Sequence, residues 1–284
     1  SRVLDHIAAC RSMCLDGADL MIGLKFPSYL LPHPNKVLWL LHQYRQVYDL
    51  WDAGQSELKA TPFGESLRRM VTDSDEVLFR ECRRIYTNSS VTGRRLKKYN
   101  GVSSEVLLPP LARPEIFRCS EYGDYVFCPS RITAGKRQHL LVEAMSRVKT
   151  GVRLVLAVLP ESPEDLTRLK NLIAAKRLED RVEIIPRFIS EEEKADLFAS
   201  ALACAYVPYD EDSYGYVSIE AFLAKKPVVT FSDSGGILAV VEDRITGRVV
   251  APTPHACAKA FDRLWSARDE AARMGRAGYD KVCL

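Results

Sequence analysis

Short apolar segments alternate with amphipathic segments along the second half of the chain, from residue 124 onward. Continuous apolar runs of this length are typical of strands that are buried on both faces of a parallel sheet. We expect strands at residues 125–128, 153–159, 182–185, 203–207, 227–231 and 248–251. Helix start signals stand between them, as a cap residue followed by Pro at 162–163 and 253–254 and as a capping box at 190–193. This alternation predicts a doubly wound α/β sheet with helices on both faces.

The first 110 residues show a similar but less regular pattern. We expect strands at 19–24, 36–42, 85–88 and 105–108, and helices at 1–16, 74–83 and 92–99. Asn100-Gly101 would end the last of these helices, and the segment 43–63 has no clear periodicity. A Pro-containing linker at 109–124 separates the two patterns, so we predict one domain at 1–110 and a second at 111–284.

The stretch from Tyr206 to Ser232 reads as strand, polar loop, helix and strand. In a parallel βαβ unit of this order, ligands bind where the first strand gives way to the helix. Two carboxylates stand there, Asp212 in the loop and Glu220 in the helix, and the first helical turn can bind an anion. A sugar nucleotide suits this arrangement, with phosphate at the helix end, ribose on Glu220 and sugar hydroxyls on Asp212. The alternative is an ordinary crossover whose loop carboxylates are solvated.

Composition narrows the class of protein. Hydrophobic residues make up 47% and charged residues 27% of the 284 residues, which is ordinary for a soluble globular protein, and the net charge of +3 gives little support for nucleic-acid binding. The eight cysteines show no zinc-ligand spacing, and Cys82, Cys128 and Cys204 lie in apolar runs, so we expect reduced thiols and a cytoplasmic location. No apolar run reaches membrane-spanning length, and the N-terminus is unlike a signal peptide.

The segment 206–232 resembles the signature of family 4 retaining glycosyltransferases, which have the GT-B fold. That signature contains a Glu, a Phe-Gly pair, a second Glu eight residues after the first, an Ala and a Pro-Val-Val strand. The corresponding positions here are Asp212, Tyr214-Gly215, Glu220-Ala221 and Pro227-Val228-Val229. The first acidic residue is therefore an Asp in place of Glu, which is one methylene shorter.

The resemblance covers nearly the whole chain and implies an α/β fold of two Rossmann-like, doubly wound domains. KVLWLLHQYRQVYDLW and IYTNSSVTGRRLKKYNG are similar to the second half of the family's N-terminal domain. The family's opening strands and glycine loop have no counterpart, so we expect the N-terminal, acceptor-side domain to be incomplete. Residues 111–284 would form the nucleotide-sugar-binding domain, without the family's terminal helix.

Two cations, Arg131 and Lys136, stand five residues apart between a strand and a helix. A departing diphosphate needs more than one cation to offset its charge, and Arg adds bidentate hydrogen bonding. In the family an Arg and a Lys at this spacing grip the donor diphosphate, so the resemblance assigns that role here. The backbone N–H groups of Gly215, Tyr216 and Val217 would assist them. The alternative is a solvated basic loop.

The resemblance extends to three further positions. Gly235-Gly236 matches a glycine loop of the family, and it either approaches the ligand or makes a tight strand–helix turn. Arg187-Phe188 stands where the family holds the nucleobase, mostly through backbone groups. His42 ends a buried strand and matches a His that faces the donor sugar in the family, although a His at a strand end also serves structural roles.

Charged clusters suggest two further contacts. The segment Arg80–Lys98 carries seven cations with Glu81 as its acidic residue: Arg80, Arg83, Arg84, Arg94, Arg95, Lys97 and Lys98. This basic patch could contact anionic lipid at the membrane surface, although a solvated charged face is the favoured interpretation. Asp210-Glu211-Asp212 resembles the Asp-x-Asp metal motif of another glycosyltransferase fold, but no further ligand residue completes it, so we expect no metal and no cofactor.

The sequence thus predicts a retaining, hexosyltransferase-type enzyme that moves a sugar from a nucleotide-diphosphate sugar to a glycan or lipid-linked acceptor, as in polysaccharide or glycolipid biosynthesis. The family implies metal-independent front-face attack, in which the leaving phosphate accepts the acceptor's proton. The alternative is a non-catalytic nucleotide-sugar-binding module that needs a partner chain for activity, and the shorter Asp212 and the expected incompleteness of the N-terminal domain motivate it. Nucleic acid is not an expected partner.

Overall fold

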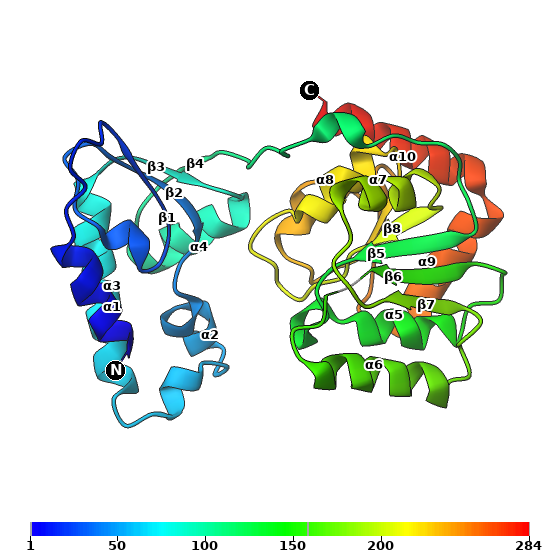
Figure 1. The fold of residues 1–284 in the computed structure, drawn as a ribbon, viewed down its shortest axis with the longest axis horizontal. Helices are drawn as coiled ribbons and strands as arrows, with labels where there is room; N and C mark the ends of the chain where they lie inside the picture. Colours follow the sequence, from blue (N-terminus) through cyan, green and yellow to red (C-terminus); the bar gives the residue numbers. More distant parts are fainter. Residues whose placement is uncertain (1, 158, 284) are drawn as a thin grey trace. The chain divides into compact units, whose positions relative to one another are not determined.

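The computed structural model describes residues 2–157 and 159–283, and the chain divides into two compact units, Ser1–Pro110 and Leu111–Leu284. Both units are α/β structures with parallel sheets (Figure 1). Short 3-10 turns add to the helices and strands, at Ser28–Leu30, Arg45–Val47, Glu57–Ala60, Pro114–Ile116, Ala134–Lys136 and Gly236–Ala239.

The second unit is built on a parallel sheet with the strand order β7-β6-β5-β8-β9-β10 in the described part of the chain. Its strands are β5 (Tyr125–Pro129), β6 (Arg153–Ala157), β7 (Val182–Ile185), β8 (Ala203–Ala205), β9 (Val228–Phe231) and β10 (Gly247–Val250). β5 and β8 are neighbours, with Val126 beside Ala203, although β6 and β7 lie between them in the chain. The sheet therefore grows in one direction and then in the other, and the reversal between β5 and β8 is its topological switch point.

Helices cover both faces of this sheet, as expected for a doubly wound fold. On one face, α5 (Gln138–Met145), α6 (Pro163–Ala175) and α9 (Pro254–Ser266) contribute to a buried apolar cluster. On the other face, α7 (Glu191–Ala199) and α8 (Tyr216–Leu223) contribute to a second cluster. Figure 1 shows α5 and α6 on the opposite side of the sheet from α7 and α8. The last helix, α10 (Arg268–Val282), packs against α8 and α9.

The helix start signals of this unit are confirmed by side-chain caps. Hydroxyl oxygens of Ser162, Ser190 and Thr253 each accept a hydrogen bond from the backbone N–H three residues later. Such a cap satisfies an N–H that has no partner within the helix. The strand predictions were also close, although β6 ends at Ala157 and β8 ends at Ala205, two residues before the expected end. Val158 of the expected strand lies outside the described residues.

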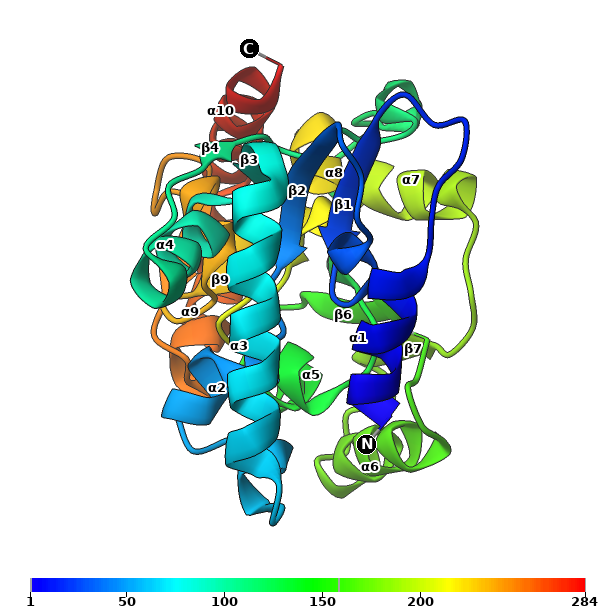
Figure 2. The ribbon, with the colours of Figure 1, turned by 90° about the vertical axis from the view of Figure 1, so that its left-hand side faces the viewer.

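The first unit has a parallel sheet in which each strand lies beside the previous one, β1 (Met21–Lys25), β2 (Lys36–His42), β3 (Cys82–Thr87) and β4 (Glu105–Val106). Its helices are α1 (Arg2–Ser12), the short α2 (Asp49–Asp52), α3 (Gly64–Glu81) and α4 (Ser90–Asn100). Residues of α1, α3 and α4 share one apolar cluster with Leu38 and Leu40 of β2. In Figure 2, α1 and α3 lie on the same side of β1 and β2.

One helix of this unit was predicted wrongly. The expected helix at 74–83 is α3, which begins ten residues earlier at Gly64 and ends at Glu81, where the chain enters β3. The apolar spacing of Leu67, Val71 and Leu78 fixes its buried face, but the polar residues between them hid that spacing. Gly101 does end α4 in the left-handed conformation, with a φ of 69°, as expected of a C-cap glycine.

The first unit contains a carboxyl group that is completely buried. Asp75 of α3 has 0% exposure and accepts hydrogen bonds from the hydroxyls of Tyr29, at 2.8 Å, and Tyr48, at 2.7 Å. Burial raises the pKa of this carboxyl from its ordinary 3.8 to about 7, although the two tyrosines act to lower it. Because the folded state holds the proton more tightly, the resulting stabilisation is complete below about pH 4 and is lost as the pH rises through 7.

Replacement of Asp75 by Asn should therefore flatten the pH dependence of the first unit's stability. In a Trp265→Phe background, fluorescence reports on Trp39 and Trp51 of that unit. We expect the parent's free energy of unfolding, measured by urea titration, to fall between about pH 4 and pH 7 by about 1.4 kcal/mol per pH unit, and that of Asp75→Asn to change less. Asp73→Asn, at an exposed position of the same helix, is the control. Equal pH dependence in all three proteins would contradict the assignment.

Candidate functional site

The candidate site lies at the carboxyl ends of β5 and β8, the neighbouring strands of the switch point. Parallel strands end at the same edge of a sheet, so the loops after β5 and β8 start side by side. The β5–α5 loop carries Arg131 and Lys136, and the β8–α8 loop carries Asp212 and Gly215. The fold therefore brings to one edge the cations and the carboxylate loop that the sequence analysis singled out separately.

The two predicted cations have different surroundings. The Arg131 side chain is 65% exposed, and its Nη1 lies 3.9 Å from Glu161 Oε1. The Lys136 side chain is 17% exposed. Its ammonium donates to Tyr206 Oη at 2.7 Å and pairs with the Glu211 carboxylate. One cation is thus open to an incoming anion, whereas the other is held by a carboxylate of the facing loop.

Arg137 is a site residue that the sequence analysis missed. Its guanidinium forms a bidentate pair with Asp233, at 2.8 and 2.7 Å, and donates to the carbonyls of Val207, at 2.9 Å, and Pro208, at 2.7 Å. Asp233 follows β9, so this side chain joins the loops after β5, β8 and β9. The pairing with Arg137 holds the pKa of the Asp233 carboxyl below its usual value. This role has no local signal in the sequence, because Val207 and Asp233 lie 70 and 96 positions away from Arg137.

The glycine loop after β9 packs against the acidic loop after β8. The N–H of Gly236 donates to Glu211 O at 2.7 Å, and the N–H of Glu211 donates to Ser234 O at 3.2 Å. A Cβ on Gly235 would lie 2.4 Å from Glu211 O, so a side chain there would collide with this backbone. The close approach that the glycines permit is therefore to the loop of Asp212. Contact of Gly235 and Gly236 with a ligand stays a prediction.

The start of α8 requires a glycine. Gly215 precedes the helix with a φ of 68°, and a Cβ there would lie 2.2 Å from the Tyr206 ring. Its own N–H donates to Ser213 Oγ at 3.3 Å. Of the three N–H groups expected to bind the diphosphate, that of Gly215 therefore has a partner inside the turn. Tyr216 is 48% exposed and Val217 is half-buried. Helix geometry leaves the first N–H groups of α8 without carbonyl partners inside the helix, which suits an anion.

Glu220 lies one turn into α8 and is almost completely buried, with 4% exposure. Its Oε1 accepts a hydrogen bond from Lys194 Nζ of α7 at 2.7 Å. Its Oε2 is also buried and has no hydrogen-bond partner among the described residues. Burial raises the pKa of this carboxyl, while the Lys194 ammonium acts in the opposite direction. Lys194 has no local signal in the sequence, because it lies 26 positions from Glu220 on a different helix.

The remaining predicted site residues belong to other segments of the chain. Arg187 follows β7 and pairs with Glu193 at 2.5 Å, and the neighbouring Phe188 is 76% exposed. His42 belongs to the first unit, where its Nδ1 lies 2.8 Å from Gln43 O and the ring is half-buried. These positions agree with the ends of β7 and β2, where the sequence placed them. Their contact with a nucleobase or a sugar stays a prediction.

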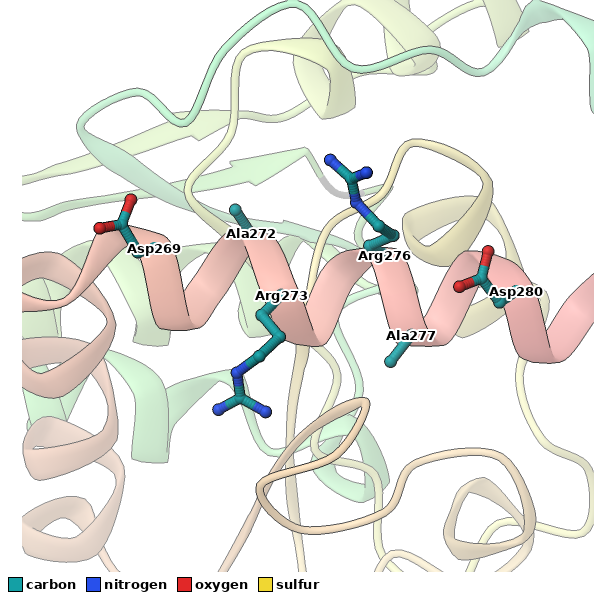
Figure 3. Close-up of a pocket in the computed structure, with 6 residues that line it drawn as sticks. All are labelled: Asp269, Ala272, Arg273, Arg276, Ala277 and Asp280. Carbon is teal, nitrogen blue, oxygen red and sulfur yellow. The ribbon is translucent and has the colours of Figure 1, made fainter.

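Other features of the surface do not add to the site. In the described parts of the chain, no group of three or more His, Cys, Asp and Glu residues could hold a metal ion. A surface hollow of about 470 Å³ is lined by residues of α10 alone: Asp269, Ala272, Arg273, Arg276, Ala277 and Asp280. Figure 3 shows the Arg273 and Arg276 side chains pointing to different sides of the helix, so the hollow does not gather its two cations.

Solved structures with a similar fold are glycosyltransferases. Sucrose-phosphate synthase from Thermosynechococcus elongatus is 20% identical with a TM-score of 0.75, covering 99% of this chain and 72% of that one. Anabaena HepE in complex with UDP is 16% identical with a TM-score of 0.75, covering 98% and 76%. The expected fold class, with α/β units of the GT-B class, is thereby confirmed.

Sequence relatives agree with the structural ones. Alpha-1,3/1,6-mannosyltransferase ALG2 is 28% identical in Mus musculus and 33% identical in Dictyostelium discoideum, over 124 residues in each case. The matched segment spans 44% of this chain but only 29% of either relative. A family model described as glycosyl transferases group 1 matches residues 116–281, more than half of the chain and nearly all of the second unit. The resemblance to family 4 glycosyltransferases is confirmed in this coarser form, and the chain belongs to the glycosyl transferases group 1 family.

Proposed function

We propose that the protein is a retaining glycosyltransferase that moves a sugar from a nucleotide-diphosphate sugar to a glycan or lipid-linked acceptor. The observation that carries this proposal is the convergence, at the switch point of the second unit, of Arg131 and Lys136 with the start of α8. A diphosphate needs this combination of cations and helix N–H groups, and α/β sheets bind ligands at this place. The family membership of the same segment supports it.

Each part of the donor has a proposed partner. Arg131, Lys136 and the N–H groups at the start of α8 would stabilise the charge that develops on the diphosphate as the sugar bond breaks. Glu220 would accept the ribose hydroxyls and Asp212 the sugar hydroxyls. Arg187-Phe188 would hold the nucleobase, and His42 of the first unit would face the sugar.

Retention is taken from the resemblance to family 4, and it requires a route that keeps the configuration of the sugar. With no enzymic nucleophile assigned, the acceptor oxygen would attack the same face of the sugar that the diphosphate leaves. Its proton would pass to the leaving phosphate oxygen, so the new glycosidic bond forms as the bond to phosphate breaks. The matched relatives transfer mannose by name and HepE binds UDP, so a hexose donor on a nucleoside diphosphate is the proposed substrate class.

The proposed location is the cytoplasm, at or near a membrane surface. None of the helices in the described parts of the chain combines the length and the apolar character needed to cross a bilayer. The residues of the Arg80–Lys98 basic patch are distributed over α3, β3 and α4, and several have acidic partners. The ion pairs are Arg80–Glu76, Arg84–Glu105, Arg95–Asp49 and Lys98–Asp52. These pairs favour a solvated charged face, and contact with lipid stays a prediction.

Removal of either cation should weaken diphosphate binding. We expect Arg131→Ala and Lys136→Ala each to lower the affinity for UDP or GDP much more than for the nucleoside, by about 1.5–3 kcal/mol per charge-assisted hydrogen bond, as measured by calorimetry. Arg168→Ala, which removes an exposed arginine of α6, is the matched control. Glu211→Gln should have the opposite effect, because it removes the carboxylate that competes for Lys136. Unchanged diphosphate affinity in both alanine variants would refute the assignment.

Metal removal should leave the protein active. Since Arg131, Lys136 and a helix end are proposed to offset the diphosphate charge, EDTA should change neither donor binding nor turnover. Titration of UDP in the presence of EDTA and of added Mg²⁺ or Mn²⁺ measures this. A strict requirement for either ion would restore Asp210-Glu211-Asp212 as a metal motif.

Substitution of Asp212 distinguishes a transferase from a module that only binds the nucleotide sugar. In a transferase, Asp212→Asn should lower the rate of sugar transfer from a UDP- or GDP-hexose while UDP or GDP affinity stays unchanged, because other residues hold the nucleotide. A module that only binds would show no turnover to lose. A parallel fall of nucleotide affinity and transfer would place Asp212 on the nucleotide instead of the sugar.

A further inference from the structure

The ion pair between Lys194 and Glu220 has no role in the function proposed so far. It joins α7 to α8, with Nζ of Lys194 at 2.7 Å from Oε1 of Glu220 and at 3.0 Å from Oε1 of Glu191. The side chains of Lys194 and Glu220 expose 15% and 6% of their surfaces. Both charges are therefore largely removed from bulk water, and Lys194, which also contacts Glu191, compensates the charge of Glu220.

The two oxygens of Glu220 have different surroundings. Oε1 is occupied by the ammonium of Lys194, while the buried Oε2 has no hydrogen-bond partner in the described parts of the chain. A buried carboxylate oxygen without a donor is unfavourable, so this position favours a ligand that brings a hydroxyl. Because Oε1 is fixed by Lys194, the carboxylate cannot rotate freely, and the direction of Oε2 is set before a ligand arrives.

We propose that Lys194 is a positioning residue that holds Glu220 in place so that its second oxygen receives a hydroxyl of the donor's ribose. This inference rests on the proposed role of Glu220 toward the ribose and adds the residue that prepares it. Lys194 acts through Glu220 and not on the reacting atoms. A purely structural alternative, in which the pair only ties α7 to α8, predicts a different set of measurements.

The ion pair also determines the charge on Glu220. Burial raises the pKa of the Glu220 carboxyl and Glu191 adds to this effect, while Lys194 opposes both. The charge of Glu220 also acts on Cys204 of β8, whose pKa is raised above its ordinary value chiefly by burial. Without Lys194, the carboxyl of Glu220 should take up a proton at a higher pH. If nucleotide binding needs the ionised carboxylate, a variant without Lys194 should lose affinity on acidification at a higher pH than the parent does.

The test compares ribonucleotides with analogues that lack the ribose hydroxyls. Affinities of UDP and GDP, and of their 2′,3′-dideoxy forms, are measured by calorimetry on the whole chain. We expect Lys194→Met, which keeps the aliphatic stem, to weaken the ribonucleotide by about tenfold and to leave the dideoxy form nearly unchanged. Lys194→Arg should restore much of the preference. Glu191→Gln is the control, because it removes the other partner of Lys194 and keeps the Glu220 pair.

The pH dependence and a double variant distinguish the outcomes. As the pH is lowered, Lys194→Met should lose the preference for the ribonucleotide at a higher pH than the parent does. The double variant Lys194→Met with Glu220→Gln should bind the ribonucleotide no more weakly than Glu220→Gln alone. Equal weakening of ribo and dideoxy forms, with a lower melting temperature, would overturn the proposal in favour of the structural alternative. If Glu220→Gln lowers the preference and Lys194→Met does not, the positioning role alone is refuted. If Glu220→Gln itself has no effect on the preference, the ribose role within the proposed function is wrong.

Discussion

The carboxyl edge of the second unit depends on one side chain, that of Arg137. Arg137 lies in the loop after β5, and its guanidinium binds the loops after the two next strands of the sheet, through Val207 and Pro208 after β8 and Asp233 after β9. Sheet hydrogen bonds align parallel strands, but they do not fix the loops beyond the strand ends. The left-handed backbone at Arg137 costs about 1 kcal/mol, and the hydrogen bonds of its side chain offset that cost. Together with the backbone hydrogen bonds from Tyr209 to Gly135 and from Asp210 to Asp233, this side chain holds the loops that carry Lys136 and Glu211 next to each other.

The charges of the candidate site are compensated inside the protein by two ion pairs of different character. Lys136 and Glu211 are partly exposed, with 17% and 26% of their side chains accessible, and an anion can replace the carboxylate at modest cost. Lys194 and Glu220 are more deeply buried, so separating them would leave an uncompensated charge. The first pair is therefore suited to exchange with a ligand, and the second is suited to remain intact while a ligand adds to it. Buried pairs contribute little net stability, so the function of the second pair is better sought in the geometry that it imposes.

Local patterns predicted the fold well, and contacts between distant segments could not be predicted in the same way. β2 and β7 have the expected bounds because continuous apolar runs and their flanking turn residues are local signals. The β8–α8 unit was found for the same reason. Gly215 marks the start of α8, because a glycine tolerates the positive φ and the close approach to Tyr206 at this position. The partners of Lys136 and Glu220 were not found. Lys136 and Glu211 are 75 residues apart, and Lys194 and Glu220 are 26 apart, so each pairing exists only after the sheet is assembled.

The geometry of the acidic loop also bears on the replacement of Glu by Asp at position 212. A shorter side chain reaches the sugar only if the loop advances or if the sugar sits lower in the site. The loop is fastened to its neighbour by the N–H of Gly236, which donates to Glu211 O at 2.7 Å, and by the N–H of Glu211, which donates to Ser234 O. A Cβ on Gly236 would lie 2.5 Å from Ser213 O and 2.8 Å from Asp212 O, so the two backbones are already in close contact. An advance of Asp212 would break these hydrogen bonds and expose their buried groups. If Asp212 contacts the donor sugar as proposed, these contacts of the loop favour a sugar that sits closer to Asp212 over a loop that moves toward the sugar.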